Sequence, residues 1–291
     1  MQEETAAAIA DAGVSAPARE RTLSRRNVGI AGGLFVFALS VFLALQHKFG
    51  IDPFGVSHAP HWVYQAWSFW HGRWDVDLPP SVTDIRTWNG KSYLFYPPLP
   101  ALVLMPFVAV FRLHTSDIFF TSAVSALNLS LLFLVFEQAR VSGLSRRATW
   151  EHVVWAVLLY FGSISLWLSL GGKVWFTAQI VTVTFILLAL WAALARHYTW
   201  GALCLGLAVL GRGPVAVTFI YLFYLAWEDT GRQPLLWRFL ASLWRRRPDW
   251  QAVPWRRILP VVGLFAAALV VYAIRNYAVF GSPMETGYGL T

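Results

Sequence analysis

The feature that most constrains this chain is a series of long apolar runs separated by short polar segments. Runs of this length, without the alternation of a half-buried strand, are typical of helices that cross a lipid bilayer. Only 13% of the residues are charged, against about 25% in a soluble domain. The sequence therefore predicts an all-α, polytopic membrane protein. The apolar runs lie at about residues 28–46, 97–113, 117–137, 152–170, 175–195, 198–211, 214–227 and 258–275.

The Lys and Arg residues predict how these runs cross the membrane. Basic residues concentrate before the first run, within 138–151, at Arg196 and within 228–257. Such residues favour the cytoplasmic side. These segments share that side only if the run at 97–113, which is short and rich in proline, does not cross. We therefore expect about seven transmembrane helices, a cytoplasmic N-terminus in the plasma (inner) membrane, and a juxtamembrane helix at 97–113 on the outer face.

This topology divides the chain into a tail and a membrane module. Residues 1–27 are polar and rich in alanine, which predicts a disordered cytoplasmic tail. Residues 28–291 form the module, whose longest outer loop spans 47–116. The net charge of +8 comes largely from the flanks of the apolar runs, so it does not indicate nucleic-acid binding. Because the chain ends soon after an apolar run, we expect a longer protein that continues beyond Thr291.

The outer loop begins with two candidate histidines. Residues 62–71 predict an amphipathic helix that ends at Gly72. His58 precedes this helix, and His61 lies at its start. Either imidazole is a candidate base or metal ligand, and a polar histidine at lipid headgroup depth fits the same pattern. The sequence leaves both interpretations open.

Asp75 and Asp77 form an Asp-x-Asp pair just after this helix. Two carboxylates at this spacing can share a divalent cation, and oxygen ligands suit Mg²⁺ or Mn²⁺. Two aspartates in a solvated loop are equally consistent with the pattern. A divalent metal at this pair is thus one prediction, and a surface loop without metal is its alternative.

A β-hairpin is predicted further along the loop. Asn89-Gly90 lies between aromatic and β-branched residues, a strong signal for a two-residue turn. We expect this hairpin to bring Lys91 and Tyr93 beside Asp84. A carboxylate next to a lysine suits deprotonation of an acceptor hydroxyl or binding of a phosphate. The alternative is a surface ion pair of little energetic value.

Arg212 lies in the turn Gly211-Arg-Gly-Pro214, between two apolar runs of about 14 residues. Helices of that length cover about 21 Å, less than the bilayer core, so the turn should lie below the outer surface. A charge recessed in the membrane is a candidate for function, and a snorkelling arginine is the alternative. Lys173, which follows two glycines, is a similar case.

Several motifs occur in an order that resembles a known family. Over residues 25–291 the chain resembles the GT-C superfamily of membrane glycosyltransferases, in the family 39-like group related to protein O-mannosyltransferases and aminoarabinose transferases. The motifs are a helix that ends in His71-Gly72, Tyr96-Pro-Pro-Leu-Pro100, Leu210-Gly-Arg-Gly-Pro214, and Arg275-Asn-Tyr277 before Phe280-Gly-Ser-Pro283.

The resemblance implies a polyprenyl-phosphate-linked sugar as donor, inversion at the anomeric carbon, and an acceptor on the extracytoplasmic face of the cell envelope. It aligns the family's catalytic carboxylate with His58, so the chain departs from the pattern there. Asp84 then becomes the first choice for the base, and Arg212 gains the role of contacting the lipid phosphate. The further substrate-binding candidates are Lys91, Tyr93, Tyr96 and Lys173.

A second hypothesis stands beside the transferase. The departure at His58 is also consistent with a non-catalytic or degenerate membrane protein that binds or transports the lipid carrier. Transporters are commonly built from repeated halves, and no internal repeat is visible in this sequence. Carrier binding is therefore the stronger form of this alternative.

Overall fold

The computed structural model describes residues 23–228 and 253–287. It is mostly helical, with 69% helix and 3% strand. The first described helix, α2, covers Arg25–Lys48 and is capped by the Ser24 hydroxyl, which accepts from the Asn27 amide. The end of the tail predicted over 1–27 is therefore helical, and most of the rest of that tail lies outside the described residues.

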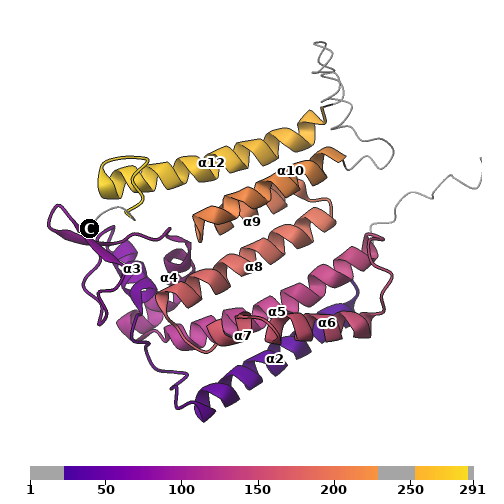
Figure 1. The fold of residues 1–291 in the computed structure, drawn as a ribbon, viewed down its shortest axis with the longest axis horizontal. Helices are drawn as coiled ribbons and strands as arrows, with labels where there is room; N and C mark the ends of the chain where they lie inside the picture. Colours follow the sequence, from indigo (N-terminus) through magenta and orange to yellow (C-terminus); the bar gives the residue numbers. More distant parts are fainter. Residues whose placement is uncertain (1–22, 229–252, 288–291) are drawn as a thin grey trace, which may run out of the picture.

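The fold is a row of helices that pack side by side. In spatial order, α2 packs on α5, α5 on α8, α8 on α9 and α9 on α12 (Figure 1). The chain direction brings the end of α2 and the starts of α5 and α8 to one end of the row, which also holds the 47–116 loop. We call this the loop end. The bounds are Asp117–Val141 for α5, Val174–Leu194 for α8, Tyr198–Val209 for α9 and Trp255–Phe280 for α12.

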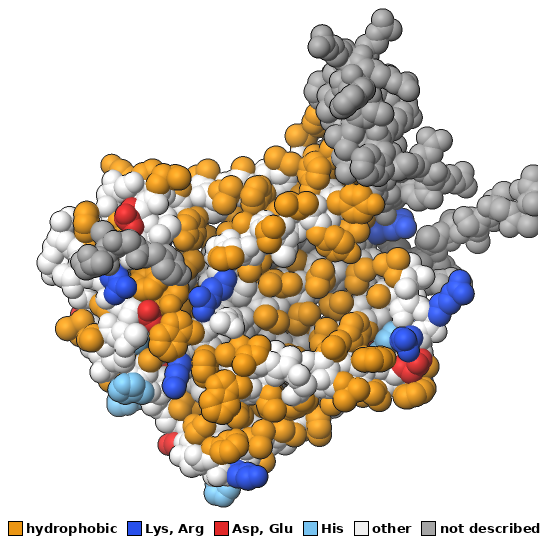
Figure 2. Space-filling view, viewed as in Figure 1, with side chains coloured by type: hydrophobic (Ala, Val, Ile, Leu, Met, Phe, Trp, Pro, Cys, Tyr) orange, Lys and Arg blue, Asp and Glu red, His pale blue; other side chains and the backbone are white. Residues whose placement is uncertain are grey.

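Among the described residues, four helices are long and apolar enough to cross a membrane: α2, α5, α8 and α12. These apolar helices indicate a membrane protein. The other apolar helices are shorter, and the 12 residues of α9 span only about 18 Å. Apolar side chains cover the middle of the row, and charged ones gather mainly toward its two ends on the face that Figure 2 shows. Length alone thus supports four of the seven expected crossings.

The run predicted at 152–170 is not one helix. The structure divides it into α6, Thr149–Phe161, and α7, Ser165–Leu168. Between them the Ser163 hydroxyl donates to the Tyr160 carbonyl and accepts from the Ser165 amide. Such local bonds from serine compete with the backbone bonds of a helix, which explains the break within an otherwise apolar run.

The loop end contains the elements predicted for 47–116. The amphipathic helix is α3, His61–Trp70, and the proline-rich run is α4, Leu99–Phe111, followed by a short turn of helix. Strands β1, Ile85–Trp88, and β2, Lys91–Leu94, form the expected hairpin. Asn89 and Gly90 both have positive φ, 49° and 73°, as a type I′ turn requires. The secondary structure of this loop was therefore predicted correctly.

Candidate functional site

The predicted outer loop, 47–116, contacts the start of α8, the turn after α9 and the end of α12 at the loop end. The Trp62 indole of α3 donates to the Val174 carbonyl at the start of α8, at 2.7 Å. The Leu99 amide of α4 donates to the Leu210 carbonyl just after α9, at 2.9 Å. Side chains from α3, β2, α4, α8 and α12 share one buried apolar cluster. This cluster holds the loop on the helix row and gives the polar groups around it fixed positions.

Arg275 of α12 joins the last helix to the hairpin. Its side chain is buried, and Nη2 donates to the Leu94 carbonyl at 2.6 Å and to the Tyr96 carbonyl at 3.2 Å. Nη1 donates to the Asn276 side chain at 3.0 Å. The guanidinium thus fixes the segment that leaves β2. Sequence reasoning noted Arg275 only within a family motif, although a cation near the end of an apolar run is a general signal of function.

Asp84 lies directly before β1, with a φ of 66° that non-glycine residues rarely adopt. Burial raises the pKa of its carboxyl above the ordinary value, and the nearby His61, Arg86 and Arg212 oppose that rise. The Tyr96 hydroxyl hydrogen-bonds to the carboxyl, whereas the buried Oδ2 has no partner. A carboxyl with a raised pKa and one oxygen without a hydrogen-bond partner suits a general base.

Tyr96 connects this carboxyl to Arg212. Its hydroxyl accepts from the Trp175 indole at 2.8 Å. The Arg212 guanidinium carbon lies 5.1 Å from the centre of the Tyr96 ring, and Nη2 donates to the Trp175 carbonyl at 3.3 Å. The buried Nε of Arg212 has no partner. Tyr96 therefore contacts both the Asp84 carboxyl and the Arg212 guanidinium, and each of these groups has a buried polar atom without a hydrogen-bond partner.

A cleft of about 420 Å³ adjoins Arg212. Gln179 lies in the second turn of α8, and Tyr272 lies eight residues before the end of α12. At about 1.5 Å per residue, these positions are about 8 to 12 Å inside the loop end. Arg212 therefore lies recessed within the helix row, and its depth below a membrane surface stays a prediction. The lining residues are Pro97, Gln179, Arg212, Gly213, Pro214 and Tyr272.

The structure brings His61, rather than His58, beside Asp84. His58 is exposed in the loop before α3. His61 is only 1% exposed, and its Nε2 lies 2.6 Å from the Thr83 carbonyl. Its Nδ1 is buried and has no partner. Both histidines were candidates on sequence grounds, and only the tertiary contact of His61 with Thr83, the residue before Asp84, distinguishes them.

The expected pair between Lys91 and Asp84 is wrong. The hairpin register pairs Lys91 with Trp88 at the turn, whereas Asp84 precedes the other end of the ladder. Lys91 Nζ instead lies 3.7 Å from Asp75. Tyr93 is buried, and its ring contacts the end of α12. The two-residue turn fixes this register, so Lys91 cannot reach the base candidate.

Asp75 and Asp77 are bound by cationic side chains. Arg73 lies 2.8 Å from Asp77 and 3.3 Å from Asp75. The hydrogen bond from Arg73 lowers the pKa of Asp77. Within residues 23–228 and 253–287, no group of three or more His, Cys, Asp or Glu side chains is placed to hold a metal ion. A cation at this pair would have to displace Arg73, and the metal stays a prediction.

Two further residues lie near this end of the row. Lys173 is exposed, with Nζ 5.8 Å from the centre of the Phe176 ring, so it borders the site. Asp117, which sequence reasoning missed, is buried and accepts from the Ser57 amide at 2.8 Å and from the Ser57 hydroxyl at 2.5 Å. A Cβ at Gly172 would lie 2.4 Å from the Asp117 backbone. Asp117 thus joins three segments and has a structural role.

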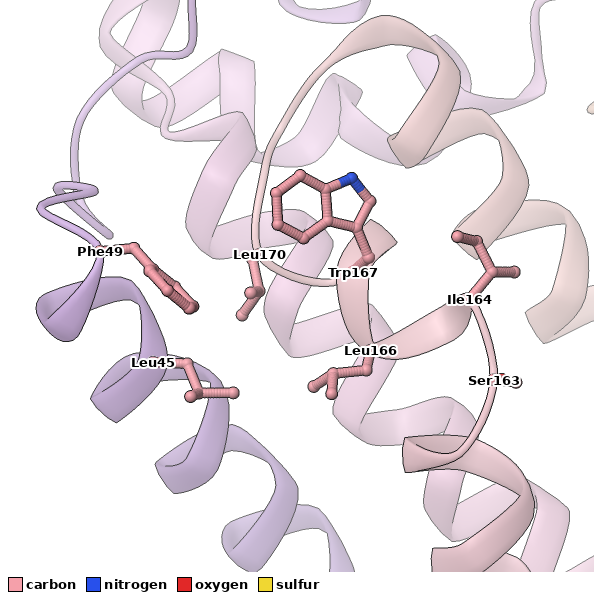
Figure 3. Close-up of a pocket in the computed structure, with 7 residues that line it drawn as sticks. All are labelled: Leu45, Phe49, Ser163, Ile164, Leu166, Trp167 and Leu170. Carbon is pink, nitrogen blue, oxygen red and sulfur yellow. The ribbon is translucent and has the colours of Figure 1, made fainter.

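A second hollow of about 440 Å³ lies between the end of α2 and the α6–α7 break. Its lining side chains include Phe49 and Trp167 but no ionisable group, so it suits a hydrocarbon chain and not the chemistry of Asp84 (Figure 3). The lining residues are Leu45, Phe49, Ser163, Ile164, Leu166, Trp167 and Leu170.

The fold and the site define a helical membrane protein with a half-buried carboxyl near two guanidinium groups at one end of its helices. No protein-family model, curated protein or solved structure matches the chain. The family resemblance therefore stays a prediction, and the function has to be argued from the geometry of the loop end.

Proposed function

We propose that this chain is a membrane glycosyltransferase, which moves a sugar from a polyprenyl-phosphate donor to an acceptor hydroxyl at the loop end of its helices. One observation carries the proposal. Asp84 hydrogen-bonds to the Tyr96 hydroxyl, and Arg212 lies over the ring of the same tyrosine. A candidate base and a candidate phosphate-binding cation thus both contact one aromatic residue, the base at its hydroxyl and the cation over its ring.

In this mechanism Asp84 acts as the general base. As the acceptor oxygen attacks C1 of the sugar, its proton passes to the carboxylate, and the bond between C1 and the phosphate oxygen breaks. The polyprenyl phosphate leaves with the electron pair, and the configuration at C1 inverts. Burial raises the pKa of Asp84, and general-base catalysis is most efficient when that pKa approaches the working pH.

Arg212 and its cleft suit the lipid carrier. The unpartnered Nε of Arg212 is available to a phosphate oxygen, and a charge-assisted bond there stabilises the leaving group. Pro97, Pro214 and Tyr272 give the cleft an apolar lining in which a prenyl chain can lie. The contact with Tyr96 orients the guanidinium, because a planar cation stacks on an aromatic ring.

We also propose that the loop end faces away from the cytoplasm of a plasma membrane. In this arrangement α6–α7, α9 and α10, Phe219–Glu228, complete seven crossings with the four long helices. Chain direction takes Arg25, Arg140, Arg196 and Arg256 to the opposite end of the row. That end therefore carries the positive charge expected on the cytoplasmic side.

A second candidate is a carrier-binding protein without transferase activity. It is favoured by the exposed imidazole of His58, which stands where the family resemblance expects a catalytic carboxylate. In that case the cleft would hold polyprenyl phosphate, and Asp84 would have no reaction to catalyse.

The test uses the full chain in lipid nanodiscs with a panel of polyprenyl-phosphate-linked hexoses and pentoses. We expect the wild type to release polyprenyl phosphate in the presence of acceptor, and Asp84→Asn to lose about 100-fold or more. Asp77→Asn, an exposed aspartate of the same loop, is the matched control and should retain activity. Saturable binding of polyprenyl phosphate without sugar transfer would support the second candidate and reject the first.

A further inference from the structure

The buried acceptors without a donor at the loop end include His61 Nδ1, Gln65 Oε1 and Asp84 Oδ2, besides Gln46 Oε1 at the end of α2 and the Ser68 hydroxyl of α3. His61 and Gln65 are each 1% exposed. They are four residues apart in α3 and so lie on one face of that helix. Buried polar atoms are almost always hydrogen-bonded, and exceptions require an explanation. The exceptions at His61, Gln65 and Asp84, in α3 and just before β1, indicate a ligand that supplies donors.

The hydrogen-bonding state of His61 follows from its neighbour. A carbonyl oxygen only accepts, so the 2.6 Å contact with Thr83 requires the hydrogen on Nε2. In the neutral ring Nδ1 then carries a lone pair and acts as an acceptor. Thr83 is adjacent to Asp84 in the chain, and the imidazole influences the Asp84 carboxyl without a hydrogen bond to it. The two acceptors are therefore neighbours.

The charges near Asp84 argue against a cationic ligand. Arg86 of β1 and Arg212 both act on the Asp84 carboxyl, and the Nε atom of each is buried without a partner. A metal ion or an ammonium group would be repelled by these two guanidinium groups. A neutral group with several hydroxyls satisfies the acceptors without this repulsion.

We propose that His61, Gln65 and Asp84 form the acceptor subsite, and that it takes a carbohydrate with adjacent hydroxyl groups. This inference rests on the proposed function. One hydroxyl donates to Asp84 and becomes the nucleophile, while its neighbour donates to His61 Nδ1. A serine or threonine side chain brings one hydroxyl and leaves the other acceptors unbonded. His61 is thus a specificity-determining residue, separate from the base.

The substitution His61→Gln separates this role from a structural one. The glutamine amide nitrogen reaches about as far as the imidazole Nε2, so it can keep the bond to the Thr83 carbonyl while the Nδ1 lone pair is lost. His61→Ala removes both. If His61 only supports the fold, the glutamine variant should behave as wild type in every assay.

The experiment measures transfer from the donor panel to methyl glycosides, to their singly deoxygenated analogues and to a serine- and threonine-containing peptide. We expect transfer to the glycosides and not to the peptide. Removal of the hydroxyl that His61 binds should raise KM about 5- to 10-fold, the usual effect of one lost hydrogen bond. His61→Gln should raise KM for the intact glycoside equally, with kcat little changed.

The decisive measurement combines the His61→Gln variant with the acceptor that lacks the hydroxyl bound by His61. His61→Gln should add no further loss with the deoxygenated analogue, because both changes remove the same hydrogen bond. Additive losses with every analogue, or preferred transfer to the peptide, overturn the acceptor subsite and leave the transferase intact. Absence of turnover by the wild type with any donor overturns both proposals.

Discussion

Two carboxyl groups at opposite ends of the helix row, the buried Glu137 and the half-buried Asp84, differ in how completely they are hydrogen-bonded. At the end opposite the loop, Glu137 of α5 is fully buried and accepts from Asn27 at 2.8 Å and from Arg140 at 2.6 Å. His152 of α6 lies 2.7 Å from its other oxygen. At the loop end, the Oδ2 atom of Asp84 has no partner.

The difference indicates what each group is for. A carboxylate whose two oxygens are both bonded holds elements together, here α2, α5 and α6 around Glu137. A buried carboxyl oxygen that lacks a partner costs folding free energy, and such costs are typically retained at sites that bind or react. This comparison supports a structural role for Glu137 and the proposed functional role for Asp84.

Among the predictions that follow, the largest effect on sugar transfer is expected at Arg212, the proposed phosphate contact. Arg212→Gln should reduce sugar transfer about 100-fold, because it removes one charge-assisted donor to the leaving group. Arg212→Lys keeps the charge but not the planar contact with Tyr96, so it should recover only part of the activity. Turnover in nanodiscs measures both. Full activity of the glutamine variant would separate Arg212 from the reaction.

Glu137→Ala should reduce stability and leave sugar transfer unchanged, the reverse of the effect expected at Arg212. Loss of this carboxylate leaves Asn27 and His152 without their partner, which should reduce stability by about 1–3 kcal/mol. Turnover per folded molecule should stay near the wild-type value. Thermal unfolding followed by a fluorescent thiol or tryptophan signal measures the first quantity, and the transfer assay the second. A variant that is stable but inactive would contradict the division between the two ends.

The pH dependence should follow Asp84. Burial raises the pKa of this carboxyl above its ordinary value of 3.8, so activity should fall as the pH drops through the raised value and the base becomes protonated. The folded state also holds this proton more tightly than the unfolded state does. Its stabilising contribution is therefore present at low pH and is lost as the pH rises through the same range.

Asp84→Asn should remove that pH dependence of stability, because the amide resembles the protonated acid at every pH. Thermal unfolding of the variant and of the wild type, measured from acid to neutral pH, should diverge as the pH rises, with the variant the more stable. A constant difference across the whole range would mean that Asp84 titrates with an ordinary pKa.

The smallest effect is expected at Asp75 and Asp77. These carboxylates already face Arg73 and Lys91, and exposed ion pairs contribute at most about 1 kcal/mol. The double change to asparagine, or treatment with EDTA, should alter transfer less than about twofold. Loss of activity on chelation and recovery with Mg²⁺ or Mn²⁺ would support the metal site predicted from the sequence.

Much of the fold could be predicted because its signals are local. The α3 helix, the type I′ hairpin and the recessed Arg212 turn each follow from a short stretch of sequence. The break at Ser163 was missed, because a single serine within an apolar run gives little warning of the bonds that it makes. The seven-span count depended on counting runs, and three of the expected crossings are too short to be established by length.

The candidate site was only partly predictable. Asp84, Tyr96 and Arg212 were named from the sequence, but the register of the hairpin took Lys91 away from Asp84. The role of Arg275 was not apparent, because its bonds to Leu94 and Tyr96 cross about 180 residues of chain. Contacts at that separation leave no periodic or spacing signal that a single sequence reveals.

The sequence by itself indicated a membrane protein and most of the helices and strands that it forms, because hydropathy, turn residues and charge placement act over short stretches. Tertiary structure decided which ionisable groups have hydrogen-bond partners for their buried polar atoms and which do not. The contact of α3 with the segment before β1 holds the buried His61 beside Asp84, whereas His58 stays exposed. Burial and the geometry of neighbours, which exist only in the folded chain, set both the raised pKa of Asp84 and its unbonded oxygen.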